Sequence, residues 1–206
     1  MPARPSTPKG RRTESAFLDA ARKVFAEHGY FNAKISDIAR AAGKSPGSFY
    51  NYYENKEELL QALLEQFSTE VLENSFKARG EDPMEGIRAA VRAYWTTYRA
   101  YLAEMVGVFQ MSMTDEVFAR RWRDHRAIGL RAVKAGIGNA ERSGHRVGVD
   151  HGLLASAIVS MLESFCWVWM AGGGDAGVDP PDDEAAIETL ATLWYRGVYH
   201  DPAPDA

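Results

Sequence analysis

Residues 45–53, SPGSFYNYY, carry closely spaced hydrogen-bonding side chains. Hydroxyl and amide groups of this kind both donate and accept hydrogen bonds. The small first turn, with Gly47 at its centre, lets a partner approach the backbone closely. This chemistry suits recognition of phosphates and base edges, so the run predicts nucleic-acid binding. The polar groups belong to Ser45, Ser48, Tyr50, Asn51 and Tyr52.

The residues before this run have the features of a short helix and a turn. Ser36 is a favourable N-cap, and Asp37 places a carboxylate at the positive helix start. Gly43 can adopt the positive φ that ends a helix. Ser45 followed by Pro46 then starts a second helix, because serine caps helix starts and proline fits the first turn. The sequence therefore predicts two short helices around a tight turn.

Apolar residues on either side predict helices that support this pair. Asn55 with Glu58 three residues later is a capping signature, so a long helix is expected to begin there. Phe49 and Tyr53 lie four residues apart and are expected to face inward. Without this context, the pair is also consistent with an ordinary helical hairpin, in which the tyrosines pack and Lys56 is solvated. Helical spacing upstream occurs at Phe17, Ala20, Ala21, Val24 and Phe25.

Residues 25–30, FAEHGY, and 35–60, ISDIARAAGKSPGSFYNYYENKEELL, together resemble the TetR family of bacterial transcriptional regulators. The resemblance covers residues 13–64 and is weak beyond them. It implies a DNA-binding helix-turn-helix domain. Lys44 departs from the family pattern, which has a small aliphatic residue there, and this lysine either extends into solvent or adds a phosphate contact. The resemblance implies phosphate or groove contacts by Ser36, Ser48, Tyr50, Tyr52 and Lys56, with Ser45, Gly47 and Asn51 nearest the base edges.

The charge of the chain is unevenly distributed. The net charge is −4, which would argue against nucleic-acid binding if it were spread evenly. Residues 1–56 hold 10 basic and 5 acidic residues, whereas residues 57–206 hold 14 and 23. A basic module joined to an acidic body can neutralise phosphates locally, and its DNA binding should depend strongly on salt.

Three prolines and four basic residues lie in the first twelve residues, MPARPSTPKGRR. This stretch is too polar to bury a core, so we expect it to be disordered. It is either a minor-groove arm or a solvated tail without a role, and it lacks the apolar region of a signal peptide. The expected divisions are a basic flexible arm over 1–10, a helix-turn-helix domain over 11–71 and a helical domain over 72–206.

The composition fits two helical domains in a reducing compartment. The 206 residues are 46% hydrophobic, which suffices for one sizeable core and a smaller one. The single cysteine, Cys166, rules out an intrachain disulfide and suits the cytoplasm, and we expect it to be a small buried hydrophobe. No alternating pattern is long enough to build a sheet, so the predicted fold class is all-α.

The second expected domain is rich in aromatic residues and methionines. We expect helices over 84–101, from the cap at 114–115 to about 144, and over 183–199. Each aromatic residue alone fits an ordinary core, but together they have the composition of an adaptable apolar pocket. The resemblance also implies an effector pocket in this part of the chain. The expected ligand-binding residues are Tyr94, Trp95, Tyr98, Met105, Phe109, Met113, Trp122, His125, Glu163 and Trp167.

Residues 153–171 form an apolar run long enough to span a membrane, but Glu163 lies at its centre and no Lys/Arg cluster flanks it. We therefore expect a buried helix, covered by its own domain and by a second copy of the chain. A Gly/Asp/Pro linker lets it pair antiparallel with the helix over 183–199. The resemblance places dimerisation at the same two helices. The expected interface residues are Leu162, Phe165, Trp169, Leu190 and Trp194.

The reactive side chains do not converge on a catalytic pattern. Glu163 has three open roles, since it could pair with an arginine, cap a donor or meet a cationic ligand. The five histidines form no HExxH motif, and Cys166 has no histidine nearby in sequence. His145, Asp150 and His151 lie in a glycine-bearing loop without a firm metal-ligand spacing. We expect no enzymatic activity, no cofactor and no metal site.

These features predict a ligand-responsive transcriptional regulator, with repression favoured by the resemblance. The expected partners are a pseudo-palindromic double-stranded DNA operator, a hydrophobic or aromatic small-molecule effector that releases the DNA, and a second copy of the chain. We expect the protein in the cytoplasm and without membrane contact. The alternative is a helical small-molecule-binding or partner-binding protein whose N-terminal module does not bind a specific operator.

Overall fold

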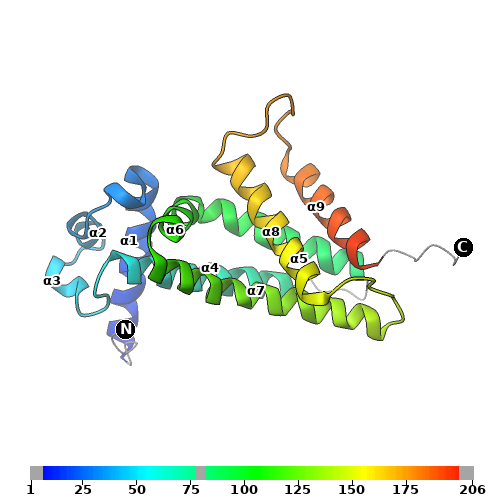
Figure 1. Cartoon of the computed structure of the whole chain (residues 1–206). Helices are drawn as coiled ribbons and strands as arrows, with labels where there is room; N and C mark the ends of the chain where they lie inside the picture. Colours follow the sequence, from blue (N-terminus) through cyan, green and yellow to red (C-terminus); the bar gives the residue numbers. More distant parts are fainter. Residues whose placement is uncertain (1–6, 78–81, 200–206) are drawn as a thin grey trace, which may run out of the picture. The chain divides into compact units, whose positions relative to one another are not determined.

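The computed structural model describes residues 7–77 and 82–199, and every helix or strand assigned in these residues is an α-helix (Figure 1). The predicted all-α fold class is confirmed. The helices are α1 (Pro8–Asn32), α2 (Ile35–Ala41), α3 (Pro46–Phe49), α4 (Lys56–Lys77), α5 (Pro83–Ala100), α6 (Leu102–Thr114), α7 (Glu116–Arg142), α8 (His151–Met170) and α9 (Asp183–Val198).

Helix α1 begins earlier than expected. The Thr7 side chain accepts a hydrogen bond from the backbone N–H of Gly10 at 3.1 Å, and Pro8 follows the cap. This combination of cap and proline starts a helix. The expected disorder was therefore wrong for residues 8–12, and residues 1–6 of the expected arm lie outside the described residues. The helix is interrupted at Gly29, whose φ is +71°.

The chain divides into two compact units, which we describe separately. Among the described residues, the first unit contains 7–67 and 101–122, and the second contains 68–77, 82–100 and 123–199. Helices α4 and α7 thus contribute residues to both units. The expected division near residue 71 differs from this one, because α6 packs against α1 and joins the N-terminal helices.

Buried aromatic rings hold the first unit together. Phe17, Phe25 and Phe49 are almost fully buried, and the rings of Phe17 and Phe49 meet edge to face with centroids 5.6 Å apart. Helix α6 approaches α1 closely at Gly107, where an added Cβ would lie 2.7 Å from the Cβ of the buried Tyr30. The unit therefore packs with little spare room at this contact.

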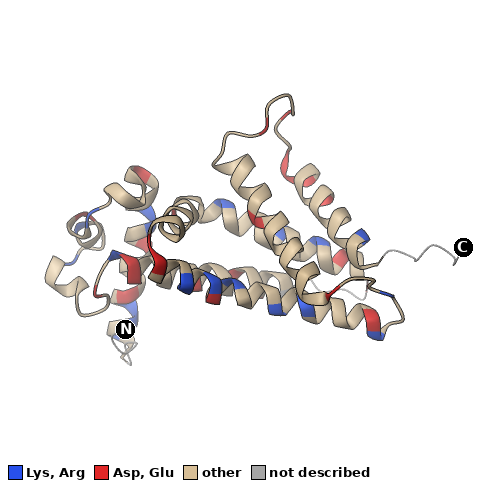
Figure 2. Cartoon of the chain, viewed as in Figure 1, with Lys and Arg blue, Asp and Glu red and all other residues tan. Residues whose placement is uncertain are grey.

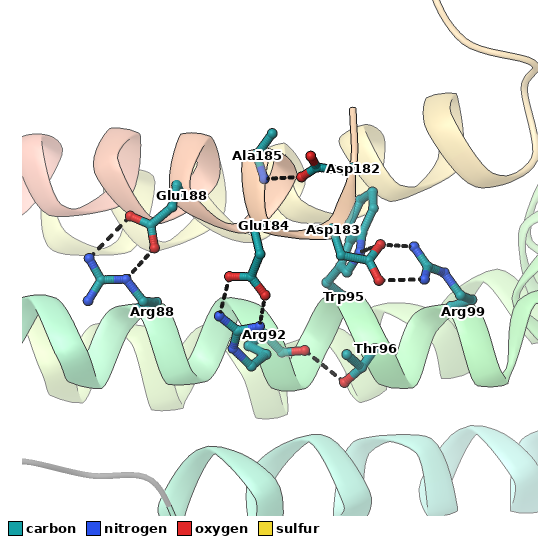
Figure 3. A network of polar contacts seen from close by, with 10 residues as sticks. All are labelled: Arg88, Arg92, Trp95, Thr96, Arg99, Asp182, Asp183, Glu184, Ala185 and Glu188. Atoms are coloured by element: carbon teal, nitrogen blue, oxygen red, sulfur yellow. Dashed lines mark hydrogen bonds and ion pairs between the residues drawn. The ribbon is translucent and has the colours of Figure 1, made fainter. Parts of the chain in front are cut away.

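In the second unit, α5 packs against both α8 and α9. Three arginines of α5 form ion pairs with three carboxylates of α9, as Figure 3 shows. Hydrogen bonds from Arg99 and then from Trp95 lower the pKa of Asp183 to about 2. Because these groups are largely exposed, the pairs fix the register of the two helices more than they add stability. The pairs are Arg88–Glu188, Arg92–Glu184 and Arg99–Asp183.

Candidate functional site

The predicted helix-turn-helix segment is formed by α2, a turn and α3. Gly43 in the turn has a φ of +66°, a conformation that glycine adopts without strain. The Ser45 side chain accepts a hydrogen bond from the backbone N–H of Ser48 at 3.2 Å, and Pro46 opens the helix. The turn and the cap of α3 are thus as predicted.

The α3 region separates buried aromatic residues from exposed polar ones. Phe49 and Tyr53 are buried, whereas Tyr50 is 57% exposed and Asn51 is exposed. Tyr52 is half-buried, and its ring lies 5.7 Å from that of Phe17. The buried rings therefore fix the orientation of a short helix whose hydrogen-bonding groups point to solvent.

The remaining predicted DNA contacts surround this short helix. Lys44, Ser45 and Gly47 are exposed, and Ser48 is half-buried. Ser36 is exposed, but its predicted capping role was wrong, because α2 begins two residues earlier than that cap implies and its N-cap position is Lys34. The side chain of Ser36 is therefore not needed to cap the helix.

Lys56 lies in a different environment from the other predicted contacts. Its Nζ donates hydrogen bonds to the carbonyl oxygens of Tyr30, Phe31 and Ala33 at 2.6, 3.1 and 3.0 Å. It also lies 4.4 Å from the centroid of the Tyr30 ring, and burial lowers its pKa. Because an ammonium group has three donors, all of them are engaged within the first unit. Lys56 ties the end of α1 to the start of α4.

Exposed basic side chains surround the α2–α3 segment. Lys34, Arg40 and Lys44 are exposed, and Figure 2 shows basic positions along α2 and the turn. Only Arg40 among them has an ion pair in the described set, with Asp37 at 3.1 Å. The segment thus offers positive charge beside its hydrogen-bonding groups, which is the combination that DNA backbones attract.

The second unit contains a cavity of about 350 Å³ between α4, α5, α7, α8 and α9. This volume is at the lower end of the range for small-molecule sites, about 300–1,000 Å³. Small residues form two of its walls, on α5 and α7, and six side chains with polar atoms also line it. The small residues are Gly86, Ala90, Gly129, Ala132 and Gly136, and the side chains with polar atoms are Ser75, Asp82, Tyr94, Asn139, Trp194 and Tyr199.

The cavity contains few of the residues that the sequence suggested as ligand contacts. Tyr94 lines it, and so do Leu162 and Trp194, which were expected at a dimer interface. Met105, Phe109, Met113 and Trp122 belong to the first unit, and Trp95, Tyr98, His125, Glu163 and Trp167 belong to the second but are not among the lining residues. The small residues were missed, although Gly129, Ala132 and Gly136 recur at the spacing of one helix face.

Two polar residues of the expected ligand set have partners within the second unit. Glu163 pairs with Arg126, whose Nε lies 2.8 Å from Oε1, so the arginine alternative holds. Burial raises the pKa of Glu163, and Arg126 opposes that shift. His125 Nε2 lies 2.5 Å from the Ser68 hydroxyl, and burial lowers the pKa of the imidazole to about 4. Both residues therefore have structural roles.

Glu163 is the only Asp, Glu, Lys or Arg of helix α8 (Figure 2). Many of the helix's side chains are half-buried or exposed. By length and composition it is the one helix in the described parts of the chain that could cross a membrane, a test that core helices also pass. Leu162 and Leu190 are buried, whereas Phe165, Trp169 and Trp194 are half-buried. Leu153 and Leu193, which the sequence did not single out, are 73% and 54% exposed.

The described residues contain no group of three or more His, Cys, Asp or Glu side chains that could hold a metal ion. His151 lies 2.8 Å from Glu141, and the thiol of Cys166 is buried with a raised pKa. A buried protonated thiol is a poor nucleophile, so Cys166 packs as a hydrophobe.

Comparisons with known proteins agree with this arrangement. Residues 17–63 match the family model for bacterial regulatory proteins, tetR family. The HTH-type transcriptional repressor AcnR of Corynebacterium glutamicum is 26% identical over 172 residues, covering 82% of this chain and 88% of that protein. These similarities include the helix-turn-helix segment described above.

Solved structures share the fold at low sequence identity. The fatty acid degradation regulator FadR from Bacillus halodurans superimposes with a TM-score of 0.76 and 22% identity, over 96% of this chain and all of that chain. FadR from Bacillus subtilis, solved in complex with stearoyl-CoA, has a TM-score of 0.74 and 19% identity, over 90% and 99% of the two chains. Residues 17–63 therefore carry the helix-turn-helix domain of the tetR family of bacterial regulatory proteins, and the protein is a DNA-binding transcriptional regulator.

Proposed function

We propose that this regulator is a repressor that binds a pseudo-palindromic operator as a homodimer and releases it when a small hydrophobic molecule binds. The observation that carries the proposal is the α3 region, where buried Phe49 and Tyr53 hold exposed Tyr50 and Asn51 in fixed positions. A rigid support of this kind is what sequence-specific contacts to DNA require.

We assign the contacts nearest the base edges to Ser45, Gly47 and Asn51. Phosphate or groove contacts are assigned to Ser36, Lys44, Ser48, Tyr50 and Tyr52. Lys56 is better described as a supporting residue, because its three donors already bind carbonyl oxygens. Lys44 is exposed, as both of its alternatives require, and we assign it a phosphate contact.

We propose that α8 and α9 form the homodimer interface. The outward residues of α8 are apolar, small or weakly polar, which allows a second helix to approach closely. Phe165 and Trp169 remain half-buried and available, whereas Leu162 and Leu190 serve the protomer core. Leu153 and Leu193 extend the exposed apolar surface. A two-fold dimer presents two α3 helices to sites about one DNA turn apart, roughly 34 Å.

The cavity of the second unit is the proposed effector site. Val71, Leu72 and Ser75 of α4 line it, while α4 begins beside α3 in the sequence. A ligand that changes the position of α4 would therefore change how the reading helices are presented, and DNA would be released. The stearoyl-CoA bound by FadR from Bacillus subtilis makes an acyl-CoA a second candidate effector. We place the regulator in the cytoplasm.

The alternative is a helical ligand-binding protein that has lost operator binding. A fluorescence anisotropy titration with DNA from upstream of the gene, at several salt concentrations, separates the two. The repressor requires sequence-selective, salt-sensitive binding by a dimer, whereas the absence of binding at low salt supports the alternative.

A matched pair of substitutions localises the DNA contact. Asn51→Ala should weaken operator binding by about 1–3 kcal/mol, because it removes hydrogen bonds to a base edge. Asn32→Ala removes an exposed asparagine elsewhere in the first unit and should leave affinity unchanged. Equal effects of the two substitutions would contradict the assignment of α3 as the reading helix.

The dimer is tested by light scattering coupled to size-exclusion chromatography. Leu153→Glu combined with Leu193→Glu should give a folded monomer with weak operator affinity, because both side chains are exposed in the protomer. Val117→Glu, at an exposed apolar position of the first unit, is the control and should remain dimeric. A dimer that survives the double substitution would place the interface elsewhere.

A further inference from the structure

The walls of the cavity leave room where side chains are missing. A Cβ added at Gly86 or Gly136 would meet no atom within 4 Å, and one added at Gly129 would meet only Val159, at 3.9 Å. The free space therefore results from small residues on α5 and α7. A ligand can lie close to the two helix backbones without displacing large side chains.

The cavity lining carries almost no charge. Among its 18 described lining residues there is no Lys, Arg, His or Glu, and Asp82 is the only ionisable acid. Asp82 lies at the start of α5, where its side chain accepts a hydrogen bond from the backbone N–H of Met84 at 3.0 Å. This carboxylate is satisfied by the helix start, and it would repel an anionic ligand.

Arginines on α7 do not compensate for this lack of positive charge. Arg126 is paired with Glu163, and its Nη2 donates to Ser160 at 3.0 Å. Arg142 donates to the side-chain oxygen of Asn139, but Arg142 itself does not line the cavity. Among the described lining residues, a ligand anion would thus find no cationic partner, and burying a charge without one is costly.

The polar groups of the lining suit a neutral ligand instead. The Ser75 hydroxyl donates to the Val71 carbonyl at 2.7 Å, so its oxygen remains able to accept a hydrogen bond. Asn139 accepts from Arg142 through Oδ1, which leaves its amide N–H groups as donors. One acceptor and one donor can orient an uncharged molecule that carries an alcohol, amine or carbonyl group.

We propose that the effector of this regulator is an uncharged, largely apolar molecule with one or two hydrogen-bonding groups, and that the cavity excludes acyl-CoA and other anions. This inference rests on the proposed function and narrows the ligand class of the same site. Of the two effector classes considered above, a small hydrophobic molecule and an acyl-CoA, it favours the first.

A pair of fluorescent probes tests the charge preference. N-phenyl-1-naphthylamine is neutral, and 8-anilinonaphthalene-1-sulfonate adds a sulfonate to the same ring system. We expect the neutral probe to bind the full-length protein at least about tenfold more tightly, because the described lining residues offer the anion no cationic partner. Methyl decanoate should likewise displace the neutral probe at concentrations where decanoate and stearoyl-CoA do not. The ester is bulkier than decanoate, so size would not explain this result.

Filling the cavity shows where the probe binds. Gly136→Leu should lower the affinity for N-phenyl-1-naphthylamine by about tenfold or more, because the new side chain occupies the free space. Gly86→Leu provides a second blockade from α5. Gly138→Leu is the matched control on α7, since Gly138 does not line the cavity and its added Cβ would meet only the flexible Arg142 side chain, at 3.4 Å.

Three outcomes would overturn the proposal. In the first, the sulfonate or stearoyl-CoA binds more tightly than the neutral probe, and Gly136→Leu abolishes this binding. In the second, the neutral probe binds the Gly136→Leu and Gly138→Leu proteins with equal affinity. In the third, the neutral probe does not bind even at its solubility limit. Operator release is measured separately by anisotropy. Neutral probe binding in the cavity without any operator binding would contradict the proposed repressor function but not the ligand preference.

Discussion

Gly107 in the first unit and two glycines in the second, Gly86 and Gly136, meet opposite packing conditions. At Gly107 of α6, an added Cβ would lie 2.7 Å from the Cβ of Tyr30 and 2.9 Å from its Cγ. At Gly86 and Gly136 in the second unit, an added Cβ would meet nothing within 4 Å. Gly107 brings two helices into contact, whereas Gly86 and Gly136 keep a space open. The same residue type therefore permits close packing at one place and free space at another.

The largest expected effect concerns the aromatic core of the first unit. Phe49→Ala should lower the free energy of unfolding by about 3–5 kcal/mol, because it removes a fully buried ring that contacts Phe17 and Tyr53. Urea denaturation followed by circular dichroism measures the change. Tyr50→Ala, at an exposed ring, should change stability by less than about 0.5 kcal/mol while weakening DNA binding. A loss below about 1 kcal/mol for Phe49→Ala would show that the first unit is not rigidly packed.

A second prediction concerns the second unit, where stability should depend on pH through the buried His125. Burial lowers the pKa of His125 to about 4, so the unfolded chain binds a proton at higher pH than the folded one. Stability from this residue is present above pH 6.5 and is lost as the pH falls from 6.5 to 4. The free energy of unfolding should therefore fall less between pH 7 and pH 4 in the His125→Gln protein than in the native protein, by about 2–4 kcal/mol.

Urea titrations at pH 7 and pH 4 provide the measurement for His125. Other titrating groups are common to both proteins and cancel in the difference. Identical pH dependence of the two proteins would show that the imidazole is solvated rather than buried beside Ser68.

A third prediction tests the contact between α6 and α1. Gly107→Ala should cost about 1–3 kcal/mol, because the methyl group collides with the stem of the buried Tyr30 side chain. Gly86→Ala is the matched control and should be neutral or stabilising by up to about 1 kcal/mol, since alanine favours a helix and has room there. Thermal unfolding of both variants measures these changes in stability. If both substitutions stabilised the protein, or both destabilised it, the proposed difference in packing between Gly107 and Gly86 would be wrong.

The smallest expected effect concerns the ion pairs between α5 and α9. The pKa of Asp183 is lowered to about 2, so its contribution to stability is present above pH 4 and is lost as the pH falls towards 2. Because the pair is exposed, this contribution is small, so Asp183→Asn should lower stability only slightly at pH 7 and should weaken the dependence of stability on pH between 4 and 2.5. Melting temperatures at pH 7, 4 and 2.5 test it, and a large destabilisation at pH 7 would show that the pair does more than set the register.

Local signals in the sequence predicted the α2–α3 segment well. Ser45 before Pro46 and Asn55 before Glu58 act through neighbours three residues away, so their roles can be inferred without the fold. The same type of signal, Thr7 before Pro8, was present at the start of α1 and was overlooked in favour of the composition. Helix caps formed between residues three positions apart can therefore be predicted from the sequence.

Other roles depend on residues distant in sequence and could not be inferred. The three carbonyl partners of Lys56 lie 23 to 26 residues away. The cavity depends on the absence of side chains at Gly86, Ala90 and Gly136, whereas the sequence directed attention to large aromatic residues. Of those aromatic residues, Trp95 and Tyr98 are buried in the core, whereas Phe109 is 41% exposed. An empty space becomes visible only when the helices around it are placed.

The uncharged surface of α8 has a consequence for synthesis of the protein. Helix α9 packs against α8 but follows it in the chain, after the linker over 171–182. A nascent chain therefore exposes α8 to chaperones before its partner helix leaves the ribosome. Premature termination within the linker would leave the surface of α8 that packs against α9 uncovered, and such a product should aggregate rather than accumulate as a soluble fragment.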